Sequence, residues 1–121
     1  MLILTGKIVL VTGGARSGKS SFAEKYVATH GEKIAYIATA QVYDEEMRYR
    51  VNLHKDRRPE NWKCIEAPYL AEFAIENSTK TNDIILFDCL TLYVTNLLLS
   101  ENAPSSMKER FNYVKEAIER I

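Results

Sequence analysis

The chain has 121 residues, of which 46% are hydrophobic and 26% charged, a balance typical of one soluble globular domain. Its 16 basic and 16 acidic residues cancel, which argues against a nucleic-acid or membrane surface, because either would show as a basic excess. The apolar run at 90–99 is too short to span a bilayer. The apolar run at the N-terminus is interrupted by Lys7, which argues against a signal peptide.

Strand and helix signals then alternate along the chain. Residues 7–12 (KIVLVT) are almost continuously apolar and β-branched, which predicts a parallel strand buried on both faces. Further along, the patterns predict strands at 34–38, 62–66 and 83–87 and helices at 19–29, 44–54, 69–77, 91–100 and 107–121. This alternation indicates an α/β fold, a mostly parallel sheet covered by helices on both faces.

The last predicted helix has no strand after it. Its apolar stripe is formed by Met107, Phe111, Val114, Ile118 and Ile121. Either this helix packs on the sheet that precedes it, or the chain is the N-terminal part of a longer protein. We expect 1–121 to form a single, incomplete domain.

A glycine-rich stretch joins the first strand to the first helix. Gly13, Gly18, Lys19 and Ser20 fit the P-loop pattern G-x-x-x-x-G-K-[ST], in its required context between a strand and a helix. Such a loop wraps phosphates with backbone N–H groups, and the helix N-terminus faces the anion. Lys19 would reach the β- and γ-phosphates, and the Ser20 hydroxyl would bind Mg²⁺. The alternative is a glycine-rich turn that binds nothing.

Acidic side chains at strand ends are candidates for the second Mg²⁺ ligand. Asp88 closes the buried run DIILFD and fits that role, although it could instead cap the following helix. Glu66 ends another short strand and is a weaker candidate, since it could equally be a surface carboxylate.

A histidine and a basic cluster follow the second predicted helix. His54 precedes Lys55, Asp56, Arg57 and Arg58. On residue types alone, a solvated helix end is the simpler interpretation. The functional alternative is a cluster that meets nucleotide phosphates, with His54 as base or nucleophile.

Several stretches together resemble one family, the bifunctional adenosylcobinamide kinase / adenosylcobinamide-phosphate guanylyltransferases of cobalamin biosynthesis. They are VTGGARSGKSSFAE (11–24), YIATA (36–40), the R-x3-H-K-D-x-R-P-x2-W run from Arg50, E-A-P (66–68) and DCLTLYVTNLL (88–98). The resemblance implies a RecA-like P-loop fold and two reactions. One phosphorylates adenosylcobinamide with ATP or GTP. The other transfers GMP from GTP to adenosylcobinamide phosphate through a guanylyl-histidine.

The resemblance also implies roles for individual residues. His54 matches the guanylylated histidine, and the basic residues after it would neutralise charge on the triphosphate. The nucleotide-binding set it implies is Gly13, Gly14, Ala15, Arg16, Ser17, Gly18, Lys19, Ser20, Ala38, Thr39, Ala40, Lys55, Asp56, Arg57, Arg58, Glu66 and Asp88. Catalysis would fall to His54 and Lys19, and Mg²⁺ to Ser20 and Asp88.

Family members continue through further strands that this sequence lacks, and the resemblance implies homo-oligomers such as trimers. Two other interpretations remain open: a plain small-molecule kinase, and a non-catalytic nucleotide-binding remnant. Cys64 and Cys89 are the only cysteines and have no metal-ligand spacing, and two lone cysteines fit reduced thiols better than a disulfide framework. Because the sequence also shows neither a signal peptide nor a membrane span, we expect a cytoplasmic protein.

Overall fold

The computed structural model describes residues 2–4, 6–14, 16–41, 44–56 and 58–121; for residues 2–4, 50 and 54 only the backbone is described. The strands are β1 (Leu2–Leu4), β2 (Ile8–Leu10), β3 (Ile34–Ala38), β4 (Lys63–Glu66) and β5 (Ile84–Asp88). The helices are α1 (Lys19–His30), α2 (Glu45–Asp56), α3 (Ala71–Thr79), α4 (Leu90–Leu98) and α5 (Met107–Glu119).

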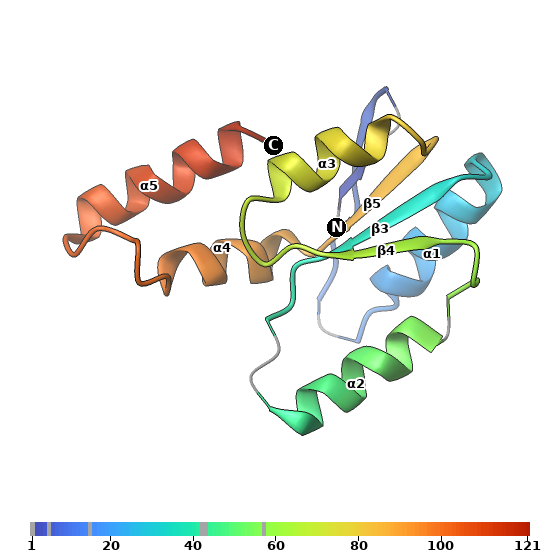
Figure 1. Ribbon diagram of the computed structural model, residues 1–121, viewed down its shortest axis with the longest axis horizontal. Helices are drawn as coiled ribbons and strands as arrows, with labels where there is room; N and C mark the ends of the chain where they lie inside the picture. The colour runs from blue at the N-terminus through green and yellow to red at the C-terminus, as the bar shows by residue number, and fades with distance from the viewer. Residues whose placement is uncertain (1, 5, 15, 42–43, 57) are drawn as a thin grey trace.

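The described strands form one sheet in the order β2-β1-β5-β3-β4 (Figure 1). β4, β3 and β5 are parallel, whereas β1 is antiparallel to both of its neighbours. Because β1 reverses direction between them, β2 runs the same way as β5. The carboxyl ends of four strands therefore meet at one edge of the sheet.

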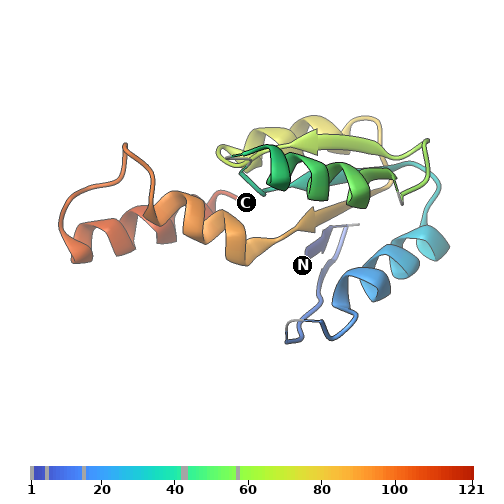
Figure 2. The ribbon, with the colours of Figure 1, turned by 90° about the horizontal axis from the view of Figure 1, so that it is seen from below.

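Helices cover both faces of the parallel strands, with α1 on one side and α3 on the other (Figure 2). Along β3, Tyr36 belongs to the cluster that contains Val27 of α1. Its neighbour Ile37 packs in the opposite cluster with Tyr93 of α4 and Ala117 of α5. Burial on both faces explains why these strands are continuously apolar, and the predicted α/β fold is confirmed.

The first predicted strand differs from expectation. β2 is an edge strand antiparallel to β1, and Ile8 and Leu10 are 72% and 59% exposed, so the prediction of a parallel strand buried on both faces was wrong. The physical reason is that Leu2–Leu4 takes the place beside β5. A strand of three residues is too short to be recognised by periodicity.

The apolar stripe of the C-terminal helix is packed at its C-terminal end and exposed at its N-terminal end. Val114, Ile118 and Ile121 contact the core cluster, whereas Met107 and Phe111 are 81% and 70% exposed. In both ribbon views, α4 and α5 extend to one side of the sheet (Figures 1 and 2).

Two further expectations concern the surroundings of the protein. Among the described helices, none combines the length and apolar character that crossing a bilayer requires. Cys64 and Cys89 are free thiols, as predicted.

Candidate functional site

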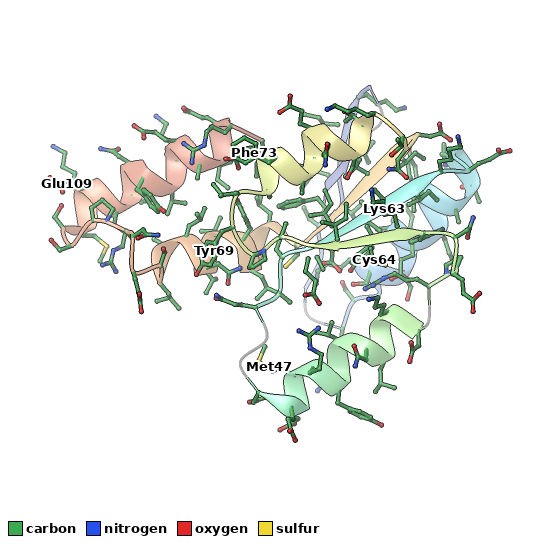
Figure 3. All side chains as sticks on the ribbon, in the orientation of Figure 1. Met47, Lys63, Cys64, Tyr69, Phe73 and Glu109 are labelled. Carbon is green, nitrogen blue, oxygen red and sulfur yellow. The ribbon has the colours of Figure 1, made fainter. Side chains whose placement is uncertain are left out.

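A cavity of about 220 Å³ opens at the carboxyl edge of the parallel strands, between α1 and α2. Cys64, labelled on β4 in Figure 3, is among its lining residues. Seven of the predicted site residues line it: Ser20, Ala38, Ala40, Lys55, Arg58, Glu66 and Asp88. Ligand pockets usually measure about 300–1,000 Å³. The cavity is therefore smaller than a typical ligand pocket.

Strand register explains why distant residues gather here. Ala38 pairs with Glu66 on one side and with Asp88 on the other. The three residues form one row across the sheet, and in-register side chains point to the same face. The backbones of Glu66 and Asp88 thus lie two strand spacings apart, about 10 Å.

The glycine-rich loop has the conformation that its glycines permit. Gly18, which precedes α1, adopts the left-handed region at φ 85°, where a side chain would be strained. The Ser17 N–H donates to the Gly14 carbonyl at 3.2 Å and closes a turn. Gly18 has no side chain to cap α1, which leaves first-turn N–H groups for an anion.

The structure divides the predicted loop residues between two cavities. Ser20 lines the cavity described above, whereas Gly13, Ser17, Gly18 and Lys19 line a groove of about 560 Å³ beside β2. Successive helix residues point about 100° apart, so Lys19 and Ser20 leave α1 in different directions. β1 also separates β2 from β5, which moves the loop one strand away from Asp88. Arg16, at φ 60°, is exposed, and Ala15 lies outside the described residues.

Asp88 is held by a tyrosine. The Tyr36 hydroxyl donates a hydrogen bond to Asp88 Oδ2. Burial, and after it the charge of Asp88, raises the pKa of Tyr36 well above its usual range, so the phenol stays protonated. The alternative role of Asp88 as a helix cap was wrong: Cys89 is the N-cap of α4, and its Sγ accepts from the Leu92 N–H at 3.4 Å.

Arg58 is the buried cation of the cavity. Its side chain is 8% exposed, and its guanidinium carbon lies 3.4 Å from the centroid of the Tyr36 ring. Nε is 3.8 Å from Glu24 Oε1, and in the described part of the chain this buried nitrogen has no hydrogen-bond partner. A buried, unsatisfied guanidinium N–H is a ready donor to an anionic ligand.

The remaining residues of the basic stretch lie on or just after α2. Lys55 lines the cavity and is exposed, and so is Asp56, the last residue of the helix. His54 is on α2, three residues after the cavity residue Val51; its side chain and all of Arg57 lie outside the described residues. Arg48 Nη1 donates to Glu66 Oε1 at 2.8 Å and links α2 to the end of β4.

Thr39 has a partner that the sequence did not reveal. The threonine is fully buried; its hydroxyl donates to the Cys89 carbonyl at 2.7 Å and accepts from the Cys89 N–H at 2.8 Å. Asn96 Nδ2 donates to the carbonyls of Thr39 (2.7 Å) and Pro68 (3.1 Å). These bonds hold together the segments that follow β3 and β5 at the edge of the cavity. Thr39 thus contributes to the site by fixing the backbone around it.

The predicted metal ligands supply only oxygen donors. The Ser20 hydroxyl and the Asp88 carboxylate line the same cavity. Among the described side chains no cluster of three or more His, Cys, Asp or Glu could hold a metal ion. Mg²⁺ is commonly bound by one or two protein oxygens and completes its coordination shell with phosphate and water. The oxygens of Ser20 and Asp88 fit this preference.

The sequence missed other residues of the cavity. Glu24, Tyr36, Val51, Cys64, Ile65 and Leu92 line it as well. Tyr36 stood within the quoted stretch YIATA, but a tyrosine in an apolar strand gives no signal beyond core packing.

Comparison with known proteins identifies the family of this chain. Residues 9–121 match the family described as cobinamide kinase / cobinamide phosphate guanyltransferase. This chain belongs to that family. The bifunctional adenosylcobalamin biosynthesis protein CobP of Pseudomonas aeruginosa is 44% identical over 93 residues, which cover 77% of this chain and 54% of CobP.

Two further members of the family are similar over comparable stretches. The bifunctional adenosylcobalamin biosynthesis protein CobU of Escherichia coli is 42% identical over 91 residues, 75% of this chain and 50% of CobU. The protein of the same name from Salmonella typhimurium is 41% identical over 116 residues, 93% of this chain and 60% of its own. The chain thus spans half to three fifths of the length of these relatives.

Proposed function

We propose that this chain provides the nucleotide-handling part of an adenosylcobinamide kinase / adenosylcobinamide-phosphate guanylyltransferase. The observation that carries the proposal is the single cavity that gathers Ser20, Asp88 and the buried Arg58 at the carboxyl edge of a parallel sheet. The names of the related proteins support the choice of pathway. ATP or GTP would be the phosphoryl donor and GTP the guanylyl donor.

In the kinase step, the acceptor hydroxyl attacks the γ-phosphorus and the bond to the β-phosphate oxygen breaks, releasing the nucleoside diphosphate. In-line transfer of this kind depends on positioning and charge stabilisation. Lys19 would meet the phosphates from the loop, and Arg58 and Lys55 from the side of α2. Mg²⁺, when bound by Ser20 and Asp88, would offset charge on the phosphate oxygens.

In the transferase step, neutral His54 attacks the α-phosphorus of GTP, a phosphorus–nitrogen bond forms and pyrophosphate leaves. The phosphate of the acceptor then attacks the same phosphorus, and histidine is released. The position of His54 on α2, beside Lys55, supports this role. The alternatives are a plain kinase, with no guanylyl-histidine, and a nucleotide-binding remnant without turnover.

The test is covalent labelling with α-labelled GTP and Mg²⁺. We expect acid-labile, base-stable label on the wild-type protein, no label on His54→Ala, and normal label on the matched control His30→Ala. Lys19→Ala should weaken GTP binding, whereas Lys108→Ala on α5 should not. Label that persists in His54→Ala contradicts the transferase assignment; γ-phosphate transfer without covalent label indicates the plain kinase, and GTP binding without either indicates the remnant.

We also propose a cytoplasmic homo-oligomer, trimeric as the family resemblance implies. The free thiols of Cys64 and Cys89 fit a reducing compartment, and the exposed Met107 and Phe111 on α5 offer apolar surface for self-association. Light scattering coupled to size exclusion should give about three times the monomer mass of 13.8 kDa. A monomer at all concentrations would contradict the proposal.

A further inference from the structure

We propose that Tyr36 is a positioning residue of the nucleotide cavity, which orients the Asp88 carboxylate with its hydroxyl and the Arg58 guanidinium with its ring. This inference rests on the proposed function, since it assigns these two charged groups to Mg²⁺ and to nucleotide phosphates. Tyr36 itself would touch neither, and it acts through its two neighbours.

The hydroxyl contact follows from strand register. Tyr36 lies two residues before Ala38, and Ala38 pairs with Asp88, so both side chains point to the same face of the sheet. The hydroxyl donates to Oδ2 of Asp88. One carboxylate oxygen is thereby held by the protein, and Asp88 lines the cavity, so Oδ1 is the oxygen that we assign to a cation.

The ring of Tyr36 contacts a positive charge, the guanidinium of Arg58, whereas its hydroxyl contacts the negative Asp88. Arg58 lies just beyond the end of α2, and its guanidinium stacks over the Tyr36 ring at 3.4 Å. Its side chain is buried, and its Nε lacks a hydrogen-bond partner among the described residues while Glu24 stands 3.8 Å away. A guanidinium over an aromatic face keeps its in-plane N–H groups free for an anion.

Both contacts come from a side chain that is only 3% exposed and packed in the core cluster with Val27 and Trp62. A tyrosine with little freedom to rotate transmits a fixed position to whatever it touches. The Asp88 carboxylate, assigned to Mg²⁺, and the Arg58 guanidinium, assigned to phosphate, are therefore both positioned by Tyr36.

Two substitutions separate the two contacts. Tyr36→Phe removes the hydroxyl and keeps the ring, whereas Tyr36→Leu removes both. The matched control is Tyr49→Phe, because Tyr49 is 65% exposed on α2. Binding of GTP with a fluorescent ribose label is titrated in EDTA and over a series of Mg²⁺ concentrations, and circular dichroism checks the fold of each variant.

For Tyr36→Phe we expect wild-type binding in EDTA and a requirement for about tenfold more Mg²⁺ to reach half of the metal-dependent gain. Tyr36→Leu should in addition weaken binding in EDTA by about threefold or more. Unchanged Mg²⁺ demand in Tyr36→Phe, or equal weakening with and without Mg²⁺, overturns the inference. If Tyr36→Leu fails to fold, Tyr36→Phe still decides. A wild-type protein that binds no nucleotide defeats the proposed function instead.

Discussion

The hydroxyl of Thr39 bonds to both backbone groups of Cys89, donating to the carbonyl at 2.7 Å and accepting from the N–H at 2.8 Å. This contact joins the ends of β3 and β5 next to the cavity. We predict that Thr39→Val, which keeps the shape of the side chain, destabilises the protein by about 1–3 kcal/mol, because two backbone groups lose their partner. Urea unfolding measures it, and Thr39→Ser should retain most of the stability. A Thr39→Val variant as stable as wild type would show that these bonds contribute little.

Glu24 places a negative charge in the cavity where phosphates are proposed to bind. Its Oε1 lies 3.8 Å from Nε of Arg58, the buried cation of the same cavity. We predict that Glu24→Gln tightens Mg²⁺-free nucleotide binding by about two- to fivefold at low salt, since a partly exposed charge pair contributes about 0.2–1 kcal/mol. Fluorescent GTP titration measures this. The control Glu119→Gln should bind as wild type does, and weaker binding by Glu24→Gln would mean that phosphates do not approach Arg58.

Asp83 stabilises the turn between α1 and β3. Its Oδ2 accepts from the N–H groups of Lys33 (3.1 Å) and Glu32 (3.3 Å), and these bonds, that from Lys33 first, hold the pKa of Asp83 below its usual value. A carboxyl whose pKa is lowered on folding stabilises the protein above the unfolded pKa, about 3.9, and loses this contribution as the pH falls through the folded pKa.

Asp83→Asn should therefore be less stable than wild type at pH 6, and the difference should shrink as the pH falls below about 4. Urea midpoints at pH 6, 4 and 3 test the sign. Glu32→Gln, which leaves the backbone donor in place, should show no such convergence. A difference in urea midpoint between wild type and Asp83→Asn that widens toward low pH would contradict the assigned hydrogen bonds.

Ser106 is the N-cap of the amphipathic helix α5. Its Oγ accepts from the Glu109 N–H at 3.2 Å, in the S-x-x-E arrangement of a capping box. We predict that Ser106→Ala costs about 1 kcal/mol of unfolding free energy, measured by urea denaturation. Ser105→Ala, one residue earlier, is the matched control and should cost little. Equal losses of unfolding free energy in Ser106→Ala and Ser105→Ala would show that the helix cap is not the cause of the destabilisation.

The sequence was most informative where strands are buried on both faces. The run at 34–38 became β3 with the predicted bounds, and the run at 83–87 became β5 displaced by one residue, because only a central strand tolerates continuous apolar residues on both faces. It was least informative at the N-terminus. Whether Leu2–Leu4 or Ile8–Leu10 lies beside β5 is decided by tertiary pairing, and both segments are short and equally apolar.

The site divides in the same way. Ser20, Glu66 and Asp88 could be placed near one another in advance, since parallel strands end at a common edge where ligands bind. The contacts of Tyr36 could not be foreseen. They depend on the register that sets it diagonally from Asp88 and on the path that returns Arg58 to the sheet after α2. Neither the register nor this chain path produces a periodic pattern in the sequence.

The pairing of Leu2 with Phe87 has a practical consequence. Phe87 is the residue before Asp88, so the first strand begins at the rim where the cavity opens. A change that disrupts this pairing would therefore reach the backbone next to the carboxylate proposed to bind Mg²⁺.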